Sequence, residues 1–324
     1  MSTHVTYRPH YCDRRYGEFT CDKIYHIKMF GMPRSLPIIS TAVIGKLNAS
    51  RLPSDTVYLT NGAFELYPVY YKKIKAKVVT MIKELTFWGF DRLPEYKKKY
   101  LKRLFSINTG IITDTKMMKF LIERHIKRVP VEISHPFCAQ PFLENRAKTD
   151  SKRIIFIGSF ESPNKGYNEM VQAFKILREK DDEWKMYMVG KRGTDFIREK
   201  VEGIHVTDFV PSLKPYLAKC SIYVHPAHFE PFGVTVLEAM SAGLIPIVTK
   251  MTGVSEVLES NRLGDLIINA PKPAEIVSKI LDVFNYSSVR KKNISRRCKN
   301  IVKKRYLENE GLKDFKNKFQ KLIN

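Results

Sequence analysis

The sequence lacks any long apolar segment: no run in its 324 residues approaches the roughly eighteen apolar residues that a membrane-spanning helix needs. Charges occur throughout the first thirty residues, so the apolar centre of a secretory signal peptide is missing as well. Cysteine is sparse, and the five cysteines are far apart and form no CxxC pair: Cys12, Cys21, Cys138, Cys220 and Cys298. Such a pattern fits free thiols in a reducing compartment. We therefore expect a cytoplasmic protein without structural disulfides.

Acidic residues are also in short supply, with 33 against 56 basic residues and a net charge of +23. The imbalance is regional: residues 1–150 carry 26 − 13 = +13, residues 151–289 carry 17 − 17 = 0, and residues 290–324 carry 13 − 3 = +10. A basic field attracts polyanions such as anionic lipid, nucleic acid or an acidic polymer, without choosing among them. A generically basic soluble surface is the alternative interpretation.

The content of hydrophobic residues, 44%, excludes a disordered polyelectrolyte, and the length favours two domains. Short β-rich runs alternate with candidate helices, and no fixed-period repeat is present. The expected strands are 56–60, 77–82, 110–113, 153–157, 185–189, 221–225 and 244–248, and the expected helices include 115–127, 167–180 and 232–242. These alternating elements predict an α/β fold with doubly wound parallel sheets. The polar, proline-containing stretch at 138–152 predicts domains of residues 1–148 and 149–324.

The most informative stretch is HPAHFEPFGVTVLEAMSAGLIPIVT at 225–249, which has the pattern of a strand end, a loop, a helix, a glycine stop and a strand. Ligands in open α/β sheets bind at the carboxyl ends of strands, and the free N–H groups of a helix start bind phosphate. Gly233 allows a close approach at that helix start. Glu230 in the loop and Glu238 inside the helix are too far apart for a carboxylate dyad, but they suit two ends of one elongated ligand. The alternative is that both are ordinary solvated acids.

Three further turns at predicted strand ends carry candidate ligand groups. GSFESPNKGYNEM (158–170) places Gly158 in a turn and Lys165 before a helix, where its ammonium can neutralise a diphosphate. MVGKRGTD places Gly190 at a strand end, followed by Lys191 and Arg192. TDFVPSLKPYL offers Phe209, Val210 and Pro211 as walls for a flat base.

Together these motifs resemble the nucleotide-sugar-dependent glycosyltransferases of family 4. The resemblance is continuous over about residues 153–285, and the EPFGxxxLEAMxxG segment is its most specific part. It implies the GT-B fold, with two Rossmann-like domains facing a cleft and the last helix crossing back onto the first domain. It also implies a retaining reaction, a UDP- or GDP-sugar as co-substrate, and neither a cofactor nor a catalytic metal.

The resemblance also implies a role for each matching residue. Glu230 would contact the hydroxyls of the transferred sugar and Glu238 the ribose, while Lys165 would pair with the diphosphate. The donor-binding set that we expect is Gly158, Ser159, Lys165, Gly190, Arg192, Val210, Pro211, Glu230, Phe232, Gly233, Val234, Thr235 and Glu238, with Glu230 and Lys165 as its catalytic members. One departure concerns Ser159, because the family usually has arginine there. Either Arg192 or Lys191 supplies the missing charge from the neighbouring loop, or the enzyme is slow or inactive.

The first half resembles the family's acceptor domain only in outline. The glycine-pair loop is not recognisable, and Gly17 is its only candidate. The histidine that often follows the fourth strand is absent, and Lys83 and Glu84 stand there instead. Together with His10 they are the acceptor-side candidates, although each also fits an ordinary polar position.

Two other patterns in the first half have an ordinary alternative. His10, Cys12, Cys21 and His26 have a number but not a spacing that suits zinc, so we expect no metal site. PEYKKKYLKRLF at 94–105 forms a basic helix whose Tyr, Leu and Phe residues make one stripe. This stripe suits either an anionic membrane surface or packing on its own domain.

We therefore expect a glycosyltransferase that moves a sugar from a nucleoside diphosphate to a lipid, glycan or protein acceptor, in the cytoplasm or at the inner membrane surface. Two alternatives stay open. One is a catalytically silent protein of the same fold that binds a nucleotide or a polyanion. The other is an enzyme that glycosylates nucleic acid, although no aromatic-interleaved binding motif supports it.

Overall fold

The computed structural model describes residues 2–6, 23–26, 57–63, 66, 69–70, 76–138, 141–196 and 201–324, and for the first two ranges only the backbone. The chain forms two compact units. One contains Met1–His135 together with Gly311–Asn324, and the other contains Pro136–Glu310. His10, Gly17, Cys12 and Cys21 lie outside the described residues, as does the side chain of His26.

The first unit is built on a six-stranded parallel sheet of order β2-β1-β3-β4-β5-β6. Its strands are β1 (Ser2–Thr6), β2 (Lys23–His26), β3 (Val57–Asn61), β4 (Val78–Ile82), β5 (Gly110–Thr113) and β6 (Val131–Ile133). Its described helices are α4 (Glu95–Phe105), α5 (Lys116–His125), α13 (Glu308–Ile323) and the short η1 (Leu85–Phe87) and η2 (Phe90–Arg92). All residues of β4 and β5 are buried, as expected for the centre of a parallel sheet covered on both faces.

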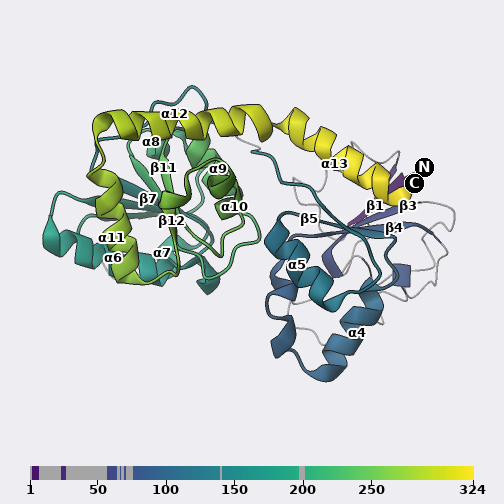
Figure 1. Ribbon diagram of the computed structural model, residues 1–324. Helices are drawn as coiled ribbons and strands as arrows, with labels where there is room; N and C mark the ends of the chain where they lie inside the picture. The colour runs from purple at the N-terminus through teal and green to yellow at the C-terminus, as the bar shows by residue number, and fades with distance from the viewer. Residues whose placement is uncertain are drawn as a thin grey trace. The chain divides into compact units, whose positions relative to one another are not determined.

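The second unit has another six-stranded parallel sheet, of order β12-β11-β10-β7-β8-β9 (Figure 1). Its strands are β7 (Arg153–Ile157), β8 (Lys185–Val189), β9 (Ile204–Thr207), β10 (Ile222–His225), β11 (Ile245–Thr249) and β12 (Ile267–Ile268). Its helices are η3 (Pro163–Lys165), α6 (Tyr167–Lys180), α7 (Gly193–Phe196), α8 (Lys214–Leu217), α9 (Val234–Ser241), α10 (Val254–Ser260), η4 (Gly264–Leu266), α11 (Pro273–Phe284) and α12 (Ser288–Arg305). Helix α6 packs beside α11, and α9 packs beside α12.

These sheets confirm the expected doubly wound α/β class. The expected strands agree with the observed ones to within one residue at each end, because continuous buried runs of β-branched and other apolar residues mark them. Helix α6 begins and ends where its pattern predicts. Helix α9 is shorter than expected at its start, because Phe232 and Gly233 belong to the preceding loop.

Helix α4 uses most of its apolar stripe inside its own unit. Leu101, Leu104 and Phe105 are buried, and the Phe105 ring packs against Phe87 with 5.3 Å between centroids. Tyr96, at the start of the helix, is exposed. The C-terminal part of the stripe therefore serves packing, and only its first residue faces solvent.

The last helix contributes its C-terminal turns to the first unit. Lys321 lies 2.6 Å from Glu132 on β6, and Leu322 packs against Gly110 on β5. The described helices include none that combines the length and the apolar character needed to cross a bilayer. Among the cysteines, Cys138, Cys220 and Cys298 are buried free thiols.

Candidate active site

The sheet order places a topological switch point at the carboxyl ends of β7 and β10, a position that we call the donor crevice. These strands are neighbours, but the chain continues from β7 to β8 on one side and from β10 to β11 on the other. In doubly wound sheets, ligands bind where the strand order reverses in this way. Lys165 follows β7 and Glu230 follows β10, so both lie in the loops at this point.

Asn164 holds these two loops together. Its side-chain amide donates to the carbonyl of Phe229 (2.9 Å), and its own carbonyl accepts from the N–H of His228 (2.8 Å). Gly166, which follows Lys165, has a φ of +75° and lies so close to the second loop that an added Cβ would be 1.8 Å from the carbonyl oxygen of Pro226. Only glycine fits this position, because both the backbone conformation and the space exclude a side chain. Lys165 is thereby held against the loop of Glu230.

Lys165, Glu230 and His225 form one polar cluster at the crevice. The ammonium of Lys165 donates to Oε2 of Glu230, and the same oxygen lies 3.4 Å from Nε2 of His225. The His225 side chain is 1% exposed, that of Glu230 12% and that of Lys165 25%. Burial would raise the pKa of Glu230, but His225 and Lys165 outweigh it and lower this pKa to about 2. Glu230 is therefore a carboxylate at neutral pH.

Behind this cluster, a short chain of polar side chains leads to helix α9. The hydroxyl of Tyr223 lies 3.1 Å from Nδ1 of His225 and 2.8 Å from Oγ1 of Thr235. Burial raises the pKa of Tyr223 well above its ordinary value, and the nearby Glu230 and Glu238 add to this effect. The neutral hydroxyl therefore connects β10 to the first turn of α9, and both carboxylates lie near it.

The start of α9 has no side-chain cap for its first backbone N–H groups. Its N-cap, Gly233, has a φ of +100°, and no side chain caps the helix. The loop before it is fixed by backbone hydrogen bonds to the segment after β11, in which Gly253 donates to Glu230 (2.9 Å) and Val254 donates to Phe232 (2.8 Å). A rigid, uncapped helix start of this kind is suited to an anion. Phe232 is buried, whereas Val234 and Thr235 are partly exposed.

Glu238 lies inside α9 in an environment that disfavours its charge. Burial raises the pKa of this carboxyl to about 7. A carboxylate that meets hydroxyl groups of a ligand would lose this penalty, because the hydroxyl hydrogen bonds stabilise its charged form. Glu238 is thus a candidate for a group that releases its proton when a ligand binds.

The turns after β7 and β8 are packed against each other. An added Cβ on Gly190, whose φ is +154°, would lie 1.7 Å from the carbonyl oxygen of Gly158. The cations expected near Ser159 are already engaged: Glu161 lies 2.7 Å from Lys191 and 3.5 Å from Arg192, and Arg192 also pairs with Asp195 at 2.8 Å. Both cations therefore lie close to the turn of Ser159, in exposed ion pairs that a ligand can exchange.

The loop after β9 contains Val210, partly exposed, and Pro211, exposed. Phe209 beside them is 82% exposed. An apolar ring with this exposure fits a surface that covers a flat ligand better than it fits a core position.

In the first unit, Lys83 and Glu84 follow β4 and stand near residues that sequence analysis did not single out. Lys83 lies 3.4 Å from the buried Asp114, which follows β5, and the carbonyl of Asp114 lies 2.6 Å from Nδ1 of His135. Glu84 lies against Gly62, where an added Cβ would be 2.9 Å from its Oε1. These groups share the carboxyl edge of the sheet.

Sequence reasoning also missed three residues of the second unit, namely His225, Tyr223 and Asn164. His225 and Tyr223 occupy the end of a predicted strand, where alternation alone gives no sign that a buried polar side chain faces an ion pair. Asn164 was hidden in a turn where asparagine is common for local reasons. In the part of the chain that the structure describes, no three His, Cys, Asp or Glu side chains come close enough to hold a metal ion.

Comparison with known proteins finds a matching family model and related sequences. Residues 151–285 match the family model "Glycosyl transferases group 1". An uncharacterized glycosyltransferase of Methanocaldococcus jannaschii is 22% identical over 303 residues, which cover 89% of this chain and 81% of the relative.

Two solved structures show the same fold. A sucrose-phosphate synthase from Thermosynechococcus elongatus superposes with a TM-score of 0.75 at 12% identity, covering 93% of this chain and 83% of that one. An Anabaena protein in complex with UDP and glucose superposes with a TM-score of 0.69 at 13% identity, covering 92% and 85%.

The chain therefore has two parallel-sheet α/β domains of the GT-B type. Residues 151–285 match the glycosyl transferases group 1 family, and the Methanocaldococcus relative that is similar over most of the chain is itself a glycosyltransferase.

Proposed function

We propose that this chain is a glycosyltransferase that uses a nucleoside diphosphate sugar, with UDP or GDP as the carrier, and retains the configuration of the anomeric carbon. The observation that carries the proposal is the cluster of Lys165, Glu230 and His225 beside the uncapped start of α9. The ammonium of Lys165 and the N–H groups at the start of α9 are donors for an anion, and Glu230, which Lys165 contacts, is an acceptor for hydroxyl groups. A diphosphate joined to a sugar has the matching two chemistries.

The reaction needs stabilisation of the leaving group above all, because the departing diphosphate gathers negative charge as its bond to the sugar breaks. Lys165 and the N–H groups at the start of α9 supply this stabilisation without a metal ion. Glu230, ionised at neutral pH, accepts hydrogen bonds from the sugar hydroxyls and orients the donor. Attack of the acceptor on the face that the diphosphate leaves, with a phosphate oxygen taking the proton of the acceptor, accounts for retention.

The family resemblance suggests the roles of the remaining donor groups in this proposal. Glu238 meets the ribose, Val210 and Pro211 flank the base, and the turns of Gly158 and Gly190 admit the diphosphate. Ser159 leaves the family's usual arginine position without a charge. Lys191 and Arg192 supply the missing positive charge. Both lie in exposed ion pairs with Glu161, so they can release Glu161 and bind phosphate oxygens instead. That the Anabaena structure with the same fold holds UDP and glucose supports a donor of this class.

The acceptor in this proposal is a lipid, a glycan or a protein. The basic first half and the basic tail favour an anionic membrane surface as the place of reaction, with nucleic acid as the competing polyanion. Sedimentation with anionic and neutral vesicles, and with an oligonucleotide, at several salt concentrations separates these partners. Binding to the oligonucleotide alone would contradict the membrane proposal.

A thermal-shift screen of UDP, GDP, ADP and their sugars tests the donor. A ligand bound only by the folded state raises the Tm, so one nucleotide series is expected to raise it by several degrees. Turnover of that donor with and without EDTA then tests the chemistry: nucleoside diphosphate is expected to be released at the same rate in both. Loss of release in EDTA would contradict metal independence.

The same assay separates the enzyme from a catalytically silent nucleotide-binding protein, an alternative that Ser159 supports. Nucleotide binding without any release of nucleoside diphosphate, in the presence and absence of acceptors, would favour the silent protein. If no nucleotide changes the Tm, both the enzyme and the silent nucleotide-binding protein are contradicted.

The proposed role of Glu238 predicts that donor affinity depends on pH. Since its pKa is about 7 in the free protein, the carboxyl is mostly protonated at pH 6 and ionised at pH 8. If the carboxylate is the binding form, the affinity for a nucleotide sugar rises about tenfold between these values and then levels off. A nucleotide sugar is the right probe because its diphosphate has no proton to release in this range. Glu238→Gln is expected to bind weakly at every pH, and a pH step that persists in this variant would contradict the assignment.

A further inference from the structure

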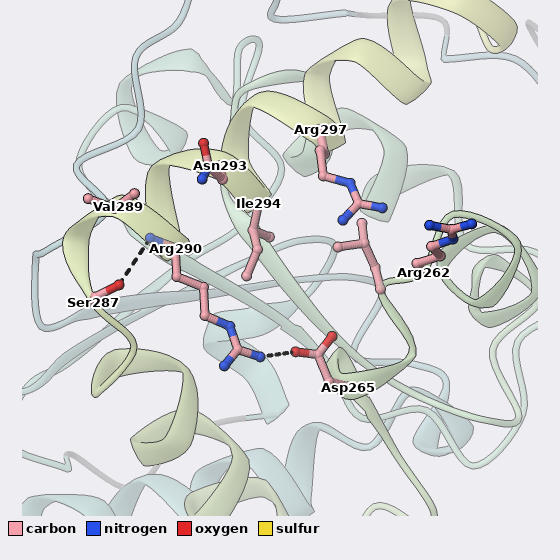
Figure 2. Close-up of a pocket in the computed structure, with 9 residues that line it drawn as sticks. Arg262, Asp265, Ser287, Val289, Arg290, Asn293, Ile294 and Arg297 are labelled. Carbon is pink, nitrogen blue, oxygen red and sulfur yellow. Dashed lines mark hydrogen bonds and ion pairs between the residues drawn. The ribbon is translucent and has the colours of Figure 1, made fainter.

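A cavity of about 320 Å³ in the second unit lies outside the donor crevice (Figure 2). It is formed where the first turns of α12 pass the segment between α10 and β12. Its lining residues are Arg262, Leu263, Asp265, Ser287, Val289, Arg290, Asn293, Ile294 and Arg297. None of them belongs to the donor-site loops. Helix α12 packs beside α9, and the ring of Tyr306 at its C-terminal end lies 6.2 Å from that of Phe232 in the donor loop, about 24 Å along the helix axis from Arg290.

The lining carries three arginines and a single acid, an excess of two positive charges. Figure 2 shows Arg290 and Arg297 extending from α12 toward the segment that carries Arg262 and Asp265. A guanidinium presents five N–H donors in a planar fork that matches the oxygens of a phosphate group. Asn293 and Ser287 add uncharged hydrogen-bonding groups to the same cavity.

Two of these arginines are already held in place. Arg290 donates to Asp265 at 2.6 Å and lies 3.6 Å above the ring of Tyr286, whose hydroxyl donates to the same carboxylate at 3.1 Å. Arg297 donates to the backbone carbonyl of Asn261. Side chains that are oriented before binding lose less conformational entropy when a ligand arrives.

Arg262 occupies a position where the backbone favours glycine. Helix α10 ends in a Schellman motif: Leu263 donates to Leu258 (2.9 Å), Arg262 donates to Glu259 (3.0 Å), and Arg262 has a φ of +53°. Glycine is usual at this position because a Cβ is strained there, at a cost of about 1 kcal/mol or more. Among the described residues, the Arg262 guanidinium has no hydrogen-bond or ion-pair partner. A strained residue with a free cationic group at the rim of a cavity is explained if that group binds a ligand.

We propose that this cavity is a second ligand site, which binds a soluble phosphorylated molecule of about the size of a sugar phosphate. The cavity volume is at the lower end of the range for small-molecule sites, and it is larger than a single phosphate ion needs. The phosphoryl group is held by Arg262 and Arg297, with Arg290 available once it leaves Asp265. The Asp265 carboxylate opposes the anion, so it sets an upper limit on affinity.

Calorimetric titration of the full chain with ribose 5-phosphate and with pyrophosphate tests this site. We expect binding that the double change Arg262→Gln and Arg297→Gln weakens at least tenfold. The matched control is Lys303→Gln with Lys304→Gln, which removes two exposed charges from the same helix and is expected to leave affinity unchanged. Lys165→Ala is also expected to leave ribose 5-phosphate binding unchanged, which separates this site from the donor crevice.

Two further variants give results that misfolding cannot imitate. Asp265→Asn removes the opposing charge and frees Arg290, so affinity is expected to rise several-fold. Arg262→Gly relieves the left-handed backbone, so it is expected to weaken binding while leaving the Tm unchanged or higher.

The proposal is overturned if neither phosphate probe binds, if the lysine control weakens binding as much as the arginine pair, or if Asp265→Asn fails to raise affinity. Vesicles containing phosphatidic acid distinguish a lipid headgroup from a soluble ligand. Binding to these vesicles alone, lost in the arginine pair, would overturn the assignment to a soluble molecule.

Discussion

Replacing Lys165 with alanine is expected to lower the turnover of sugar transfer by about 10²–10³-fold, the usual effect of removing one group that stabilises a leaving anion. Lys165 is the cation closest to Glu230 in the crevice, and its ammonium is fixed there by that carboxylate. The diphosphate carries more charge in the transition state than in the bound donor, so the loss appears mainly in kcat. The measurement is nucleoside diphosphate release at saturating donor.

The control is Lys180→Ala, which removes an exposed lysine at the end of α6 and is expected to leave turnover unchanged. Because Glu230 keeps His225 as a neighbour, Lys165→Ala is expected to fold, and adding Glu230→Gln removes the remaining buried charge if it does not. Turnover near the parent level in folded Lys165→Ala would exclude the leaving-group role.

The second large effect is expected from Gly166→Ala. The new Cβ would stand 1.8 Å from the Pro226 carbonyl oxygen, in a backbone with a φ of +75°. Strain and overpacking each cost about 1–3 kcal/mol, so the free energy of unfolding is expected to fall by about 3 kcal/mol or more. Relief of the clash also moves Lys165 away from Glu230, so turnover falls with stability. Thermal unfolding and donor turnover measure the two effects.

Gly264→Ala is the matched control in the same unit. Its nearest neighbour would be Cγ of Glu259 at 4.0 Å, an ordinary contact, and its φ lies outside the left-handed region. A change in the free energy of unfolding within about 0.5 kcal/mol is expected. Equal effects of the two alanines would mean that the close approach of the loops does not depend on Gly166.

Seven of the described strands (β3, β4, β5, β7, β8, β10 and β11) and the donor loops were predictable because their signals are local, whereas β1, β2, β6, β9 and β12 were not expected. Buried parallel strands appear as short apolar runs, and the glycines at 158, 166, 190 and 233 mark turns whether or not the neighbouring loop is known. Lys165 and Glu230 were found for the same reason, since each stands in the loop that follows a recognisable strand. The resemblance then connected segments that local patterns leave separate.

Other features had no local signal. His225 and Asn164 matter through contacts with residues 5 and 65 positions away, respectively, and their neighbours in sequence say nothing of these contacts. The cavity lined by Arg262, Arg290 and Arg297 joins two segments that are neutral or merely basic when counted along the chain. Segment charge predicts the attraction of anions, but it cannot place three guanidinium groups around one cavity.

By itself, then, the sequence determined the α/β class, the positions of the strand ends and the family of the second half, because backbone preferences and apolar runs act over a few residues. Only the tertiary structure decided the ionisation of Glu230 and Glu238, at pKa values of about 2 and about 7. The pKa values of these two glutamates, eight positions apart, differ because Glu230 is buried beside His225 and Lys165. Glu238 is buried without a neighbouring cation. Desolvation and charge pairing are properties of the folded surroundings, which no single segment contains.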